Sequence, residues 1–187
     1  MYLRNQTNSC KVGNLILGGN DKVYIQSMTN TKTSDVESTV KQINLLAEAG
    51  CDIIRVACLN MDDARAIAEI KKRIHIPLVA DIHFDPNLAI EAIKQGVDKI
   101  RLNPGNISNT EKIKEIVRLA KEHNVAIRIG VNGGSLPKGM TLNAKNMIEA
   151  CKMHTSILEE LDFHNIVISL KASNVALCKE AYELASQ

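Results

Sequence analysis

The chain has few aromatic residues and no long apolar run, and both absences narrow what it can be. Of its 187 residues only 3% are aromatic and none is Trp, so the core must be built mainly from Ile, Leu, Val and Ala. No apolar run reaches the length of a membrane span, and Met1 to Asn20 has no hydrophobic stretch of the signal-peptide type. We therefore expect a cytoplasmic protein that does not bind a membrane.

A charge excess and a metal-binding cysteine motif are missing as well. The net charge of +2 is too small to indicate binding to nucleic acid. The five cysteines form an odd set without the Cys-x-x-Cys spacing of zinc or iron–sulfur sites. We expect no metal ligand among them, and no cofactor bound by this chain itself.

The sequence does contain a regular alternation of strand-like and helical segments. Six apolar strand-like runs each end in a polar cluster and precede a helix; they lie at 23–27, 51–58, 78–82, 97–103, 125–132 and 165–173. Such alternation is typical of a parallel sheet with helices packed outside it. Ahead of them, Lys11–Leu17 is separated from Val23 by the turn residues Gly18 to Asp21. We expect this run to be a hairpin arm that closes the bottom of the domain.

Three helix starts carry capping signals. Ser34-Asp35-Val36-Glu37 and Ser108-Asn109-Thr110-Glu111 have the form of capping boxes, in which the Ser is the N-cap. Asp85-Pro86 has the form of an N-cap followed by proline at the first helical position.

Both an open doubly wound sheet and a (β/α)8 barrel fit this pattern. Polar residues at every strand end favour the barrel, because a doubly wound sheet concentrates them at one switch point. Eight βα units close a barrel, and the chain has only about six. We therefore predict an α/β fold, a TIM-type (β/α)8 barrel truncated after about six βα units. Residues 1–187 would form one partial, substrate-binding barrel domain.

Successive strand residues point to opposite faces, so the period of two separates polar from apolar positions. The polar set should line the barrel mouth; it includes Arg55, Arg101, Arg128 and Lys171. These four cations meet one inward carboxylate, Asp81. A salt-bridge layer that only packs the mouth is the alternative, but buried unpaired cations are costly. The surplus of positive charge favours a phosphate-bearing ligand, because guanidinium groups bind phosphate well.

Several neutral residues can complete such a site. Asn103, Asn132 and Gln26 can donate to phosphate oxygens or substrate hydroxyls, and Ser173 supports them. Gly105 would let backbone N–H groups approach a ligand. His83 could donate a proton or bind phosphate. The other histidines are expected to be solvated; they are His75, His123, His154 and His164.

Lys171 could in principle form a Schiff base instead. Nothing nearby in the sequence supplies the desolvation that such chemistry needs, so charge pairing with an anion is favoured.

Five strings at the strand ends carry a family resemblance. They are Gln-Ser-Met-Thr-Asn-Thr at 26–31, Val-Ala-Asp-Ile-His-Phe at 79–84, Arg-Leu-Asn-Pro-Gly-Asn-Ile at 101–107, Arg-Ile-Gly-Val-Asn at 128–132 and Lys-Ala-Ser at 171–173. Together they resemble the barrel motifs of the 4-hydroxy-3-methylbut-2-enyl diphosphate synthase family. The resemblance covers nearly the whole chain, from Val12-Gly13-Asn14 onward.

The resemblance implies an iron–sulfur oxidoreductase of the non-mevalonate isoprenoid pathway. Such enzymes convert 2-C-methyl-D-erythritol 2,4-cyclodiphosphate into the linear butenyl diphosphate by reductive ring opening and dehydration. A separate carboxy-terminal domain carries a 4Fe–4S cluster, ferredoxin or flavodoxin supplies electrons, and the parent is a homodimer. The diphosphate clamp falls by motif on Arg55, Arg101, Arg128 and Lys171, with hydrogen bonds from His83, Asn103 and Asn132.

The cluster domain has no counterpart in this sequence, so the resemblance implies that these 187 residues alone are inactive. Two rival interpretations stay open. One is a pterin-binding transferase of the dihydropteroate synthase type, which also uses Asp, Asn, Lys and Arg at strand ends. The other is a non-catalytic barrel fragment that binds anions or self-associates through its open sheet edges.

Overall fold

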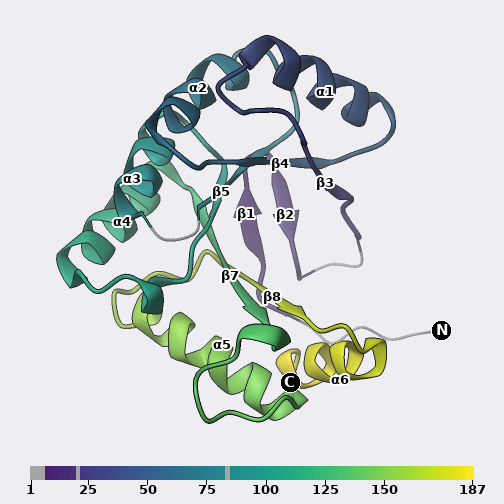
Figure 1. Ribbon diagram of the computed structural model, residues 1–187, viewed down its shortest axis with the longest axis vertical. Helices are drawn as coiled ribbons and strands as arrows, with labels where there is room; N and C mark the ends of the chain where they lie inside the picture. The colour runs from purple at the N-terminus through teal and green to yellow at the C-terminus, as the bar shows by residue number, and fades with distance from the viewer. Residues whose placement is uncertain (1–6, 20–21, 83–84) are drawn as a thin grey trace.

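The computed structural model describes residues 7–19, 22–82 and 85–187, and these residues form a curled parallel sheet with helices on its outer side (Figure 1). The sheet strands are β3 (Gln26–Met28), β4 (Ile53–Ala57), β5 (Leu78–Asp81), β6 (Lys99–Arg101), β7 (Ala126–Asn132) and β8 (Ile166–Lys171). The helices are α1 (Val36–Glu48), α2 (Met61–Lys71), α3 (Pro86–Lys94), α4 (Thr110–His123), α5 (Ala144–Glu159) and α6 (Val175–Ala185). Two short 3-10 helices follow strands β6 and β7; they are η1 (Pro104–Asn106) and η2 (Gly133–Ser135).

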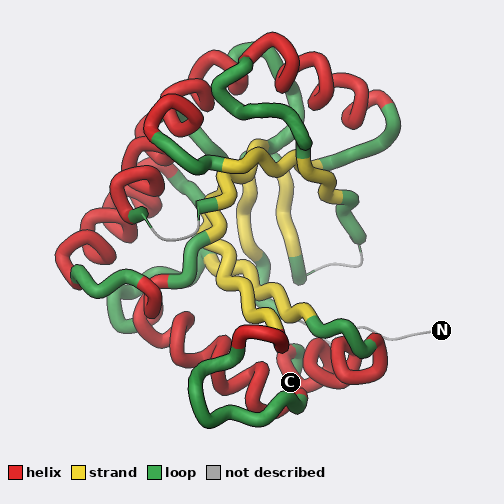
Figure 2. The backbone as a smooth tube through the Cα atoms, viewed as in Figure 1, coloured by secondary structure: helices red, strands yellow, loops and turns green. Residues whose placement is uncertain are grey.

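The order of the strands confirms the barrel type. Each strand pairs in parallel with the next one along the chain, from β3 to β8, without the reversal of order that defines a doubly wound sheet. In Figure 2 the strands line the inside of an arc and the helices lie outside it. The described residues therefore form an open part of a (β/α)8 barrel, with β3 and β8 at its two edges.

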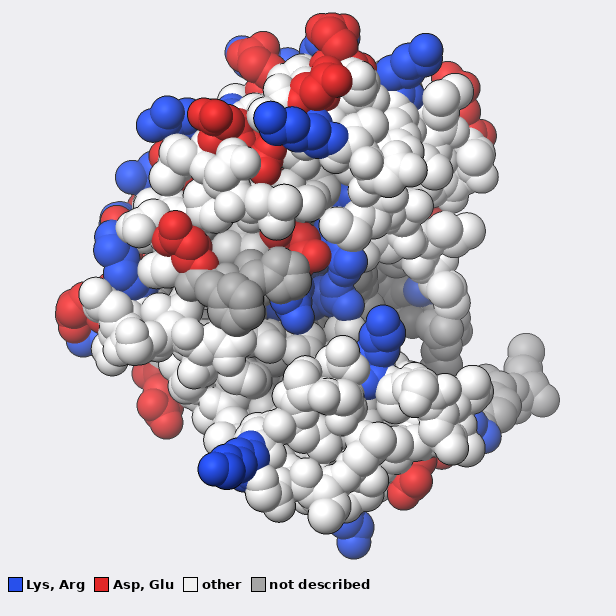
Figure 3. All heavy atoms as spheres, in the orientation of Figure 1, with Lys and Arg blue, Asp and Glu red and all other residues white. Residues whose placement is uncertain are grey.

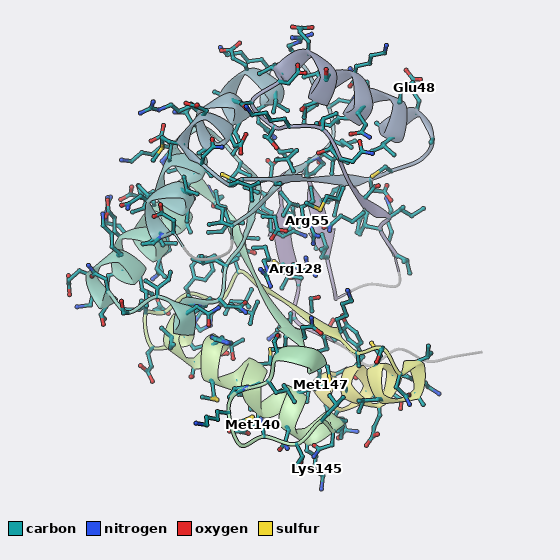
Figure 4. All side chains as sticks on the ribbon, in the orientation of Figure 1. Glu48, Arg55, Arg128, Met140, Lys145 and Met147 are labelled. Carbon is teal, nitrogen blue, oxygen red and sulfur yellow. The ribbon has the colours of Figure 1, made fainter. Side chains whose placement is uncertain are left out.

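The predicted alternation along the strands is confirmed. The outward residues pack into the core between sheet and helices; for example, Ile54, Ile100 and Ile129 are fully buried there. The intervening residues point into the arc, where Arg55 and Arg128 are only partly covered (Figure 4). Toward the carboxyl ends of the strands, the outer face therefore packs against the helices and the inner face carries polar groups.

The hairpin at the bottom of the barrel differs from the prediction. Strands β1 (Cys10–Val12) and β2 (Leu15–Leu17) pair with each other, so the run predicted as one arm contains both arms. The turn is at Gly13, whose positive φ of 57° suits glycine, rather than at the Gly18 turn signal. The hairpin does close the bottom, because Cys10 and Val12 pack on Ala126 at the start of β7.

Helix caps lie one residue later than the capping boxes predicted. Asp35 and Asn109, not the preceding serines, accept from the backbone N–H groups of Ser38 and Lys112. Asx side chains compete well with serine for this position, so the pattern alone does not choose between neighbours. The Asp85-Pro86 start of α3 is confirmed. Within the described ranges, no helix is both long and apolar enough to cross a membrane.

Candidate functional site

The four predicted clamp cations line a single cavity of about 200 Å³ at the carboxyl ends of the strands, hereafter the cation cavity. Its lining consists of Arg55, Asp81, Arg101, Arg128, Gly130, Val131, Asn132, Ser169 and Lys171. Figure 3 shows basic atoms gathered in the central hollow of this face, and Figure 4 shows Arg55 and Arg128 inside the arc. The cations come from β4, β6, β7 and β8, so the curvature of the sheet brings them together.

Asp81 lies between two of the arginines and is the one carboxylate among the described residues that line the cation cavity. Its Oδ2 is 3.7 Å from Arg55 Nε, and its Oδ1 is 3.9 Å from Arg101 Nη1. Both separations exceed hydrogen-bond length, so the attraction is that of neighbouring charges and not of a forked guanidinium–carboxylate pair. One carboxylate thus offsets only part of the positive charge.

Arg128 shows the resulting repulsion most clearly. Burial lowers the pKa of its guanidinium, and the positive charges of Arg55 and Arg101 lower it further. Arg128 Nη2 donates to Ser169 Oγ at 2.5 Å. This bond links the Arg128 side chain on β7 to the neighbouring strand β8. The cavity therefore has a positive potential that a polyanion would relieve.

The two predicted asparagines are held differently. Asn103 Nδ2 donates to the carbonyl oxygen of Gly130 at 2.8 Å, and its Oδ1 accepts from Gly130 N at 3.0 Å. Its amide thus ties the end of β6 to β7. Asn132 Oδ1 accepts from Gly134 N at 3.2 Å, so a ligand would meet Asn132 through its Nδ2 group.

The other predicted residues are not all at the cavity. Gln26 is not part of the cavity lining and accepts a hydrogen bond from Lys99. Ser173 is exposed in the loop between β8 and α6, outside the cavity lining. His83 lies outside the described residues, so its predicted role stays a prediction.

A second, larger cavity of about 640 Å³ adjoins the cation cavity, shares Arg101 and Asn132 with it, and extends under η1 to α5. Here Gly105 N donates to His154 Nδ1 at 3.1 Å. A Cβ on Gly105 would lie 2.6 Å from that nitrogen, so the glycine makes room for the histidine and not for a ligand. The prediction that His154 is solvated is wrong: it is half-buried, and burial lowers its pKa.

Lys99 is a residue that the strand-end patterns did not single out. It is 2% exposed and shares the inward face of β6 with Arg101. The same period of two that identified Arg101 and Asn103 would have found it two positions earlier. It lies at the beginning of β6 and not at the polar carboxyl end of that strand.

The cysteines do not form a metal centre within this part of the chain. All five are free, and burial raises the pKa of Cys10 to about 11, of Cys58 to about 12 and of Cys151 to about 11. Such thiols stay protonated at neutral pH, whereas a metal ligand must be a thiolate. The described residues also contain no group of three His, Cys, Asp or Glu side chains that could hold a metal ion. An iron–sulfur cluster therefore does not fit these residues.

The chain is similar in sequence to one group of enzymes. A family model described as the GcpE TIM-barrel domain matches residues 7–187. The chain is 58% identical to the 4-hydroxy-3-methylbut-2-en-1-yl diphosphate synthase (flavodoxin) of Geobacillus thermodenitrificans, over 98% of this chain and 50% of that protein. It is 56% identical to the synthase of the same name from Bacillus subtilis, again over 98% of this chain and 50% of that protein. The chain thus spans about half the length of these relatives.

Two solved structures that share the fold come from enzymes of other names. A type I 3-dehydroquinate dehydratase from Clostridium difficile matches 94% of this chain and 74% of its own, with a TM-score of 0.68 and 20% identity. A Yersinia pestis dihydropteroate synthase matches 94% of this chain and 68% of its own, with a TM-score of 0.67 and 11% identity. At these identities the likeness shows the fold alone.

Proposed function

Because the chain belongs to the GcpE TIM-barrel family, we propose that it forms the diphosphate-binding part of a 4-hydroxy-3-methylbut-2-enyl diphosphate synthase. Its ligand would be 2-C-methyl-D-erythritol 2,4-cyclodiphosphate. The observation that carries the proposal is the cation cavity, in which four basic side chains surround one carboxylate. A pterin ring offers no negative charge to satisfy such a cavity, whereas a diphosphate does.

The residues act by binding and by charge stabilisation. The guanidinium groups of Arg55, Arg101 and Arg128 and the ammonium of Lys171 would hold the two phosphates, and Asn132 Nδ2 would orient them. When the ring opens, the diphosphate oxygen that leaves carbon takes a full negative charge. Cations already fixed in the cavity stabilise that charge without reorganising.

The redox half of the reaction belongs outside the described residues. We propose that the parent protein carries a 4Fe–4S cluster on a further domain, assembles as a homodimer, and works in the cytoplasm. Residues 1–187 would be its partial barrel domain and would be inactive alone. We propose flavodoxin as the electron donor, because the names of the relatives include it. Ferredoxin is the alternative that the family resemblance allows.

Isothermal titration calorimetry of the chain with the cyclic diphosphate tests the proposal. We expect one site per chain, whose affinity falls as salt is raised, because the contacts are ionic. Binding of a pterin with no response to the cyclic diphosphate would overturn the proposal in favour of a transferase. Equal affinity for sulfate and for the cyclic diphosphate would indicate a general anion site.

A further inference from the structure

Lys99 is a fully buried lysine beneath the cation cavity. It lies on β6 two residues before Arg101, on the same inward face but nearer the bottom of the barrel. Its Nζ donates to Gln26 Oε1 at 3.2 Å, across the arc on β3. It forms no ion pair with any residue of the described ranges. A buried ammonium without a carboxylate costs stability, so its presence requires an explanation.

The groups around Lys99 include two positive charges, which repel its ammonium. Arg55 on β4 and Arg128 on β7 oppose its protonation, and Cys10 on β1 favours it. On either side its strand partners are Val79 on β5 and Ala126 on β7, which are apolar.

Asp81, the carboxylate of the cation cavity, lies one inward position above Val79 and is placed between Arg55 and Arg101. Gln26 Oε1 accepts the hydrogen bond from Lys99 Nζ and carries no charge to balance the ammonium. The groups that act on Lys99 through charge or this hydrogen bond are thus two cations, a thiol and an amide.

We propose that Lys99 is a positioning residue of the diphosphate site, which takes up a proton when the diphosphate enters the cation cavity above it. Its ammonium then holds Gln26 and adds a fifth positive charge under Arg55 and Arg128. The proton comes from solvent and returns to it when the ligand leaves. This inference rests on the proposed function, since it needs a polyanion in that cavity.

The direction of the coupling follows from the charges. In the ligand-free chain, burial and the two arginines lower the pKa of Lys99 to about 8. A bound diphosphate offsets the arginine charges and raises that pKa. Because the coupling is reciprocal, the affinity for diphosphate must fall as pH rises above 8, by up to about tenfold per pH unit until the pKa of the complex is reached.

The test is calorimetry of the 187-residue chain with 2-C-methyl-D-erythritol 2,4-cyclodiphosphate in two buffers of different ionisation enthalpy. The phosphates of this ligand do not titrate near neutral pH, so any proton uptake belongs to the protein. We expect uptake of about half a proton or more per site at pH 8.5 and about none at pH 6.5. The wild-type measurement needs no variant, so it is decisive even if a substitution prevents folding.

Variants assign the proton to Lys99. Lys99→Met should bind the ligand about tenfold or more weakly at pH 7 and show no uptake at pH 8.5, and Lys99→Gln should do the same. Lys41→Met, on the exposed face of α1, is the matched control and should behave as wild type. Circular dichroism checks that each variant is folded.

The outcomes separate the two proposals. Failure of the wild-type chain to bind the cyclic diphosphate overturns the proposed function and this inference with it. Binding without proton uptake at pH 8.5, or uptake that persists in Lys99→Met, overturns only the role of Lys99.

Discussion

The side-chain amide of Asn103 and the backbone of Gly130 are joined by two hydrogen bonds of 2.8 and 3.0 Å, one in each direction. They tie Asn103, the residue just before η1, to β7. The same glycine leaves space for Arg101, because a Cβ there would lie 3.3 Å from Arg101 Nε. This pair of residues thus fixes the segment after β6 to β7 beside the cation cavity.

Replacing Asn103 with Ala should therefore weaken both the fold and the site. It leaves the N–H and C=O of Gly130 without their partners, which costs about 1–3 kcal/mol for an unsatisfied buried group. Urea denaturation measures that loss, and calorimetry should show weaker diphosphate binding. Asn87→Ala, exposed on α3, is the control and should change neither quantity. Unchanged stability in Asn103→Ala would contradict the bridging role.

Removing one clamp cation should separate binding from stability. Arg128→Met eliminates a charge that Arg55 and Arg101 repel, so we expect no loss of free energy of unfolding beyond that of the Ser169 hydrogen bond, about 1 kcal/mol. Diphosphate binding should weaken by about 2–5 kcal/mol, as for truncation of a buried charged contact. Arg118→Met, whose side chain is 59% exposed on α4, should bind as wild type. Equal affinities in the two variants would show that Arg128 is not part of the clamp.

The buried ammonium of Lys99 should make the stability of the ligand-free chain rise at alkaline pH. Its pKa is lowered from 10.5 to about 8 on folding, so between these values the unfolded chain binds more protons and stability increases with pH. Lys99→Met has no ammonium to bury at this position. It should therefore be more stable than wild type at pH 7.5, by about 1.4 kcal/mol per unit of pKa shift. Denaturation at pH 7.5 and pH 10 checks the prediction, because the difference should shrink at pH 10. A constant difference would mean that Lys99 is not titrating in this range.

His154 should make the fold sensitive to acid. Burial lowers its pKa below the usual 6.5, so the folded chain holds the ring neutral while the unfolded chain protonates it. Stability should be complete above pH 6.5 and should decrease as pH falls through the pKa of the folded state. His154→Gln should remove this part of the acid loss, whereas His123→Gln on the exposed face of α4 should keep it. Thermal denaturation between pH 7 and pH 5 distinguishes the two variants.

Sequence reasoning identified the basic residues that line the cation cavity because their signal is local. Side chains in a strand alternate with a period of two, so the shared face of Arg101 with Asn103, or of Arg128 with Asn132, follows from spacing alone. The alternation of strands and helices likewise predicts a parallel sheet, and sheets of this kind gather their carboxyl ends at one edge. These inferences need no knowledge of which strands are neighbours.

The residues that sequence reasoning misplaced depend on contacts between distant segments. Whether His154 is solvated is decided by η1, 49 residues earlier in the chain, which covers it through Gly105. The hairpin turns at Gly13 and not at the stronger turn signal at Gly18, and this turn lets Val12 pack against Ala126. Spacing along a helix or strand contains no information about such partners.

The sequence by itself thus determined the architecture and the face of each strand that carries charge, because both arise from short-range geometry. Only the tertiary structure decided that Asn103 holds β7, and that Lys99 lies buried beneath two arginines. The physical reason is that hydrogen-bond partners, burial and electrostatic repulsion depend on the distances between strands, and those distances exist only after the sheet has curled.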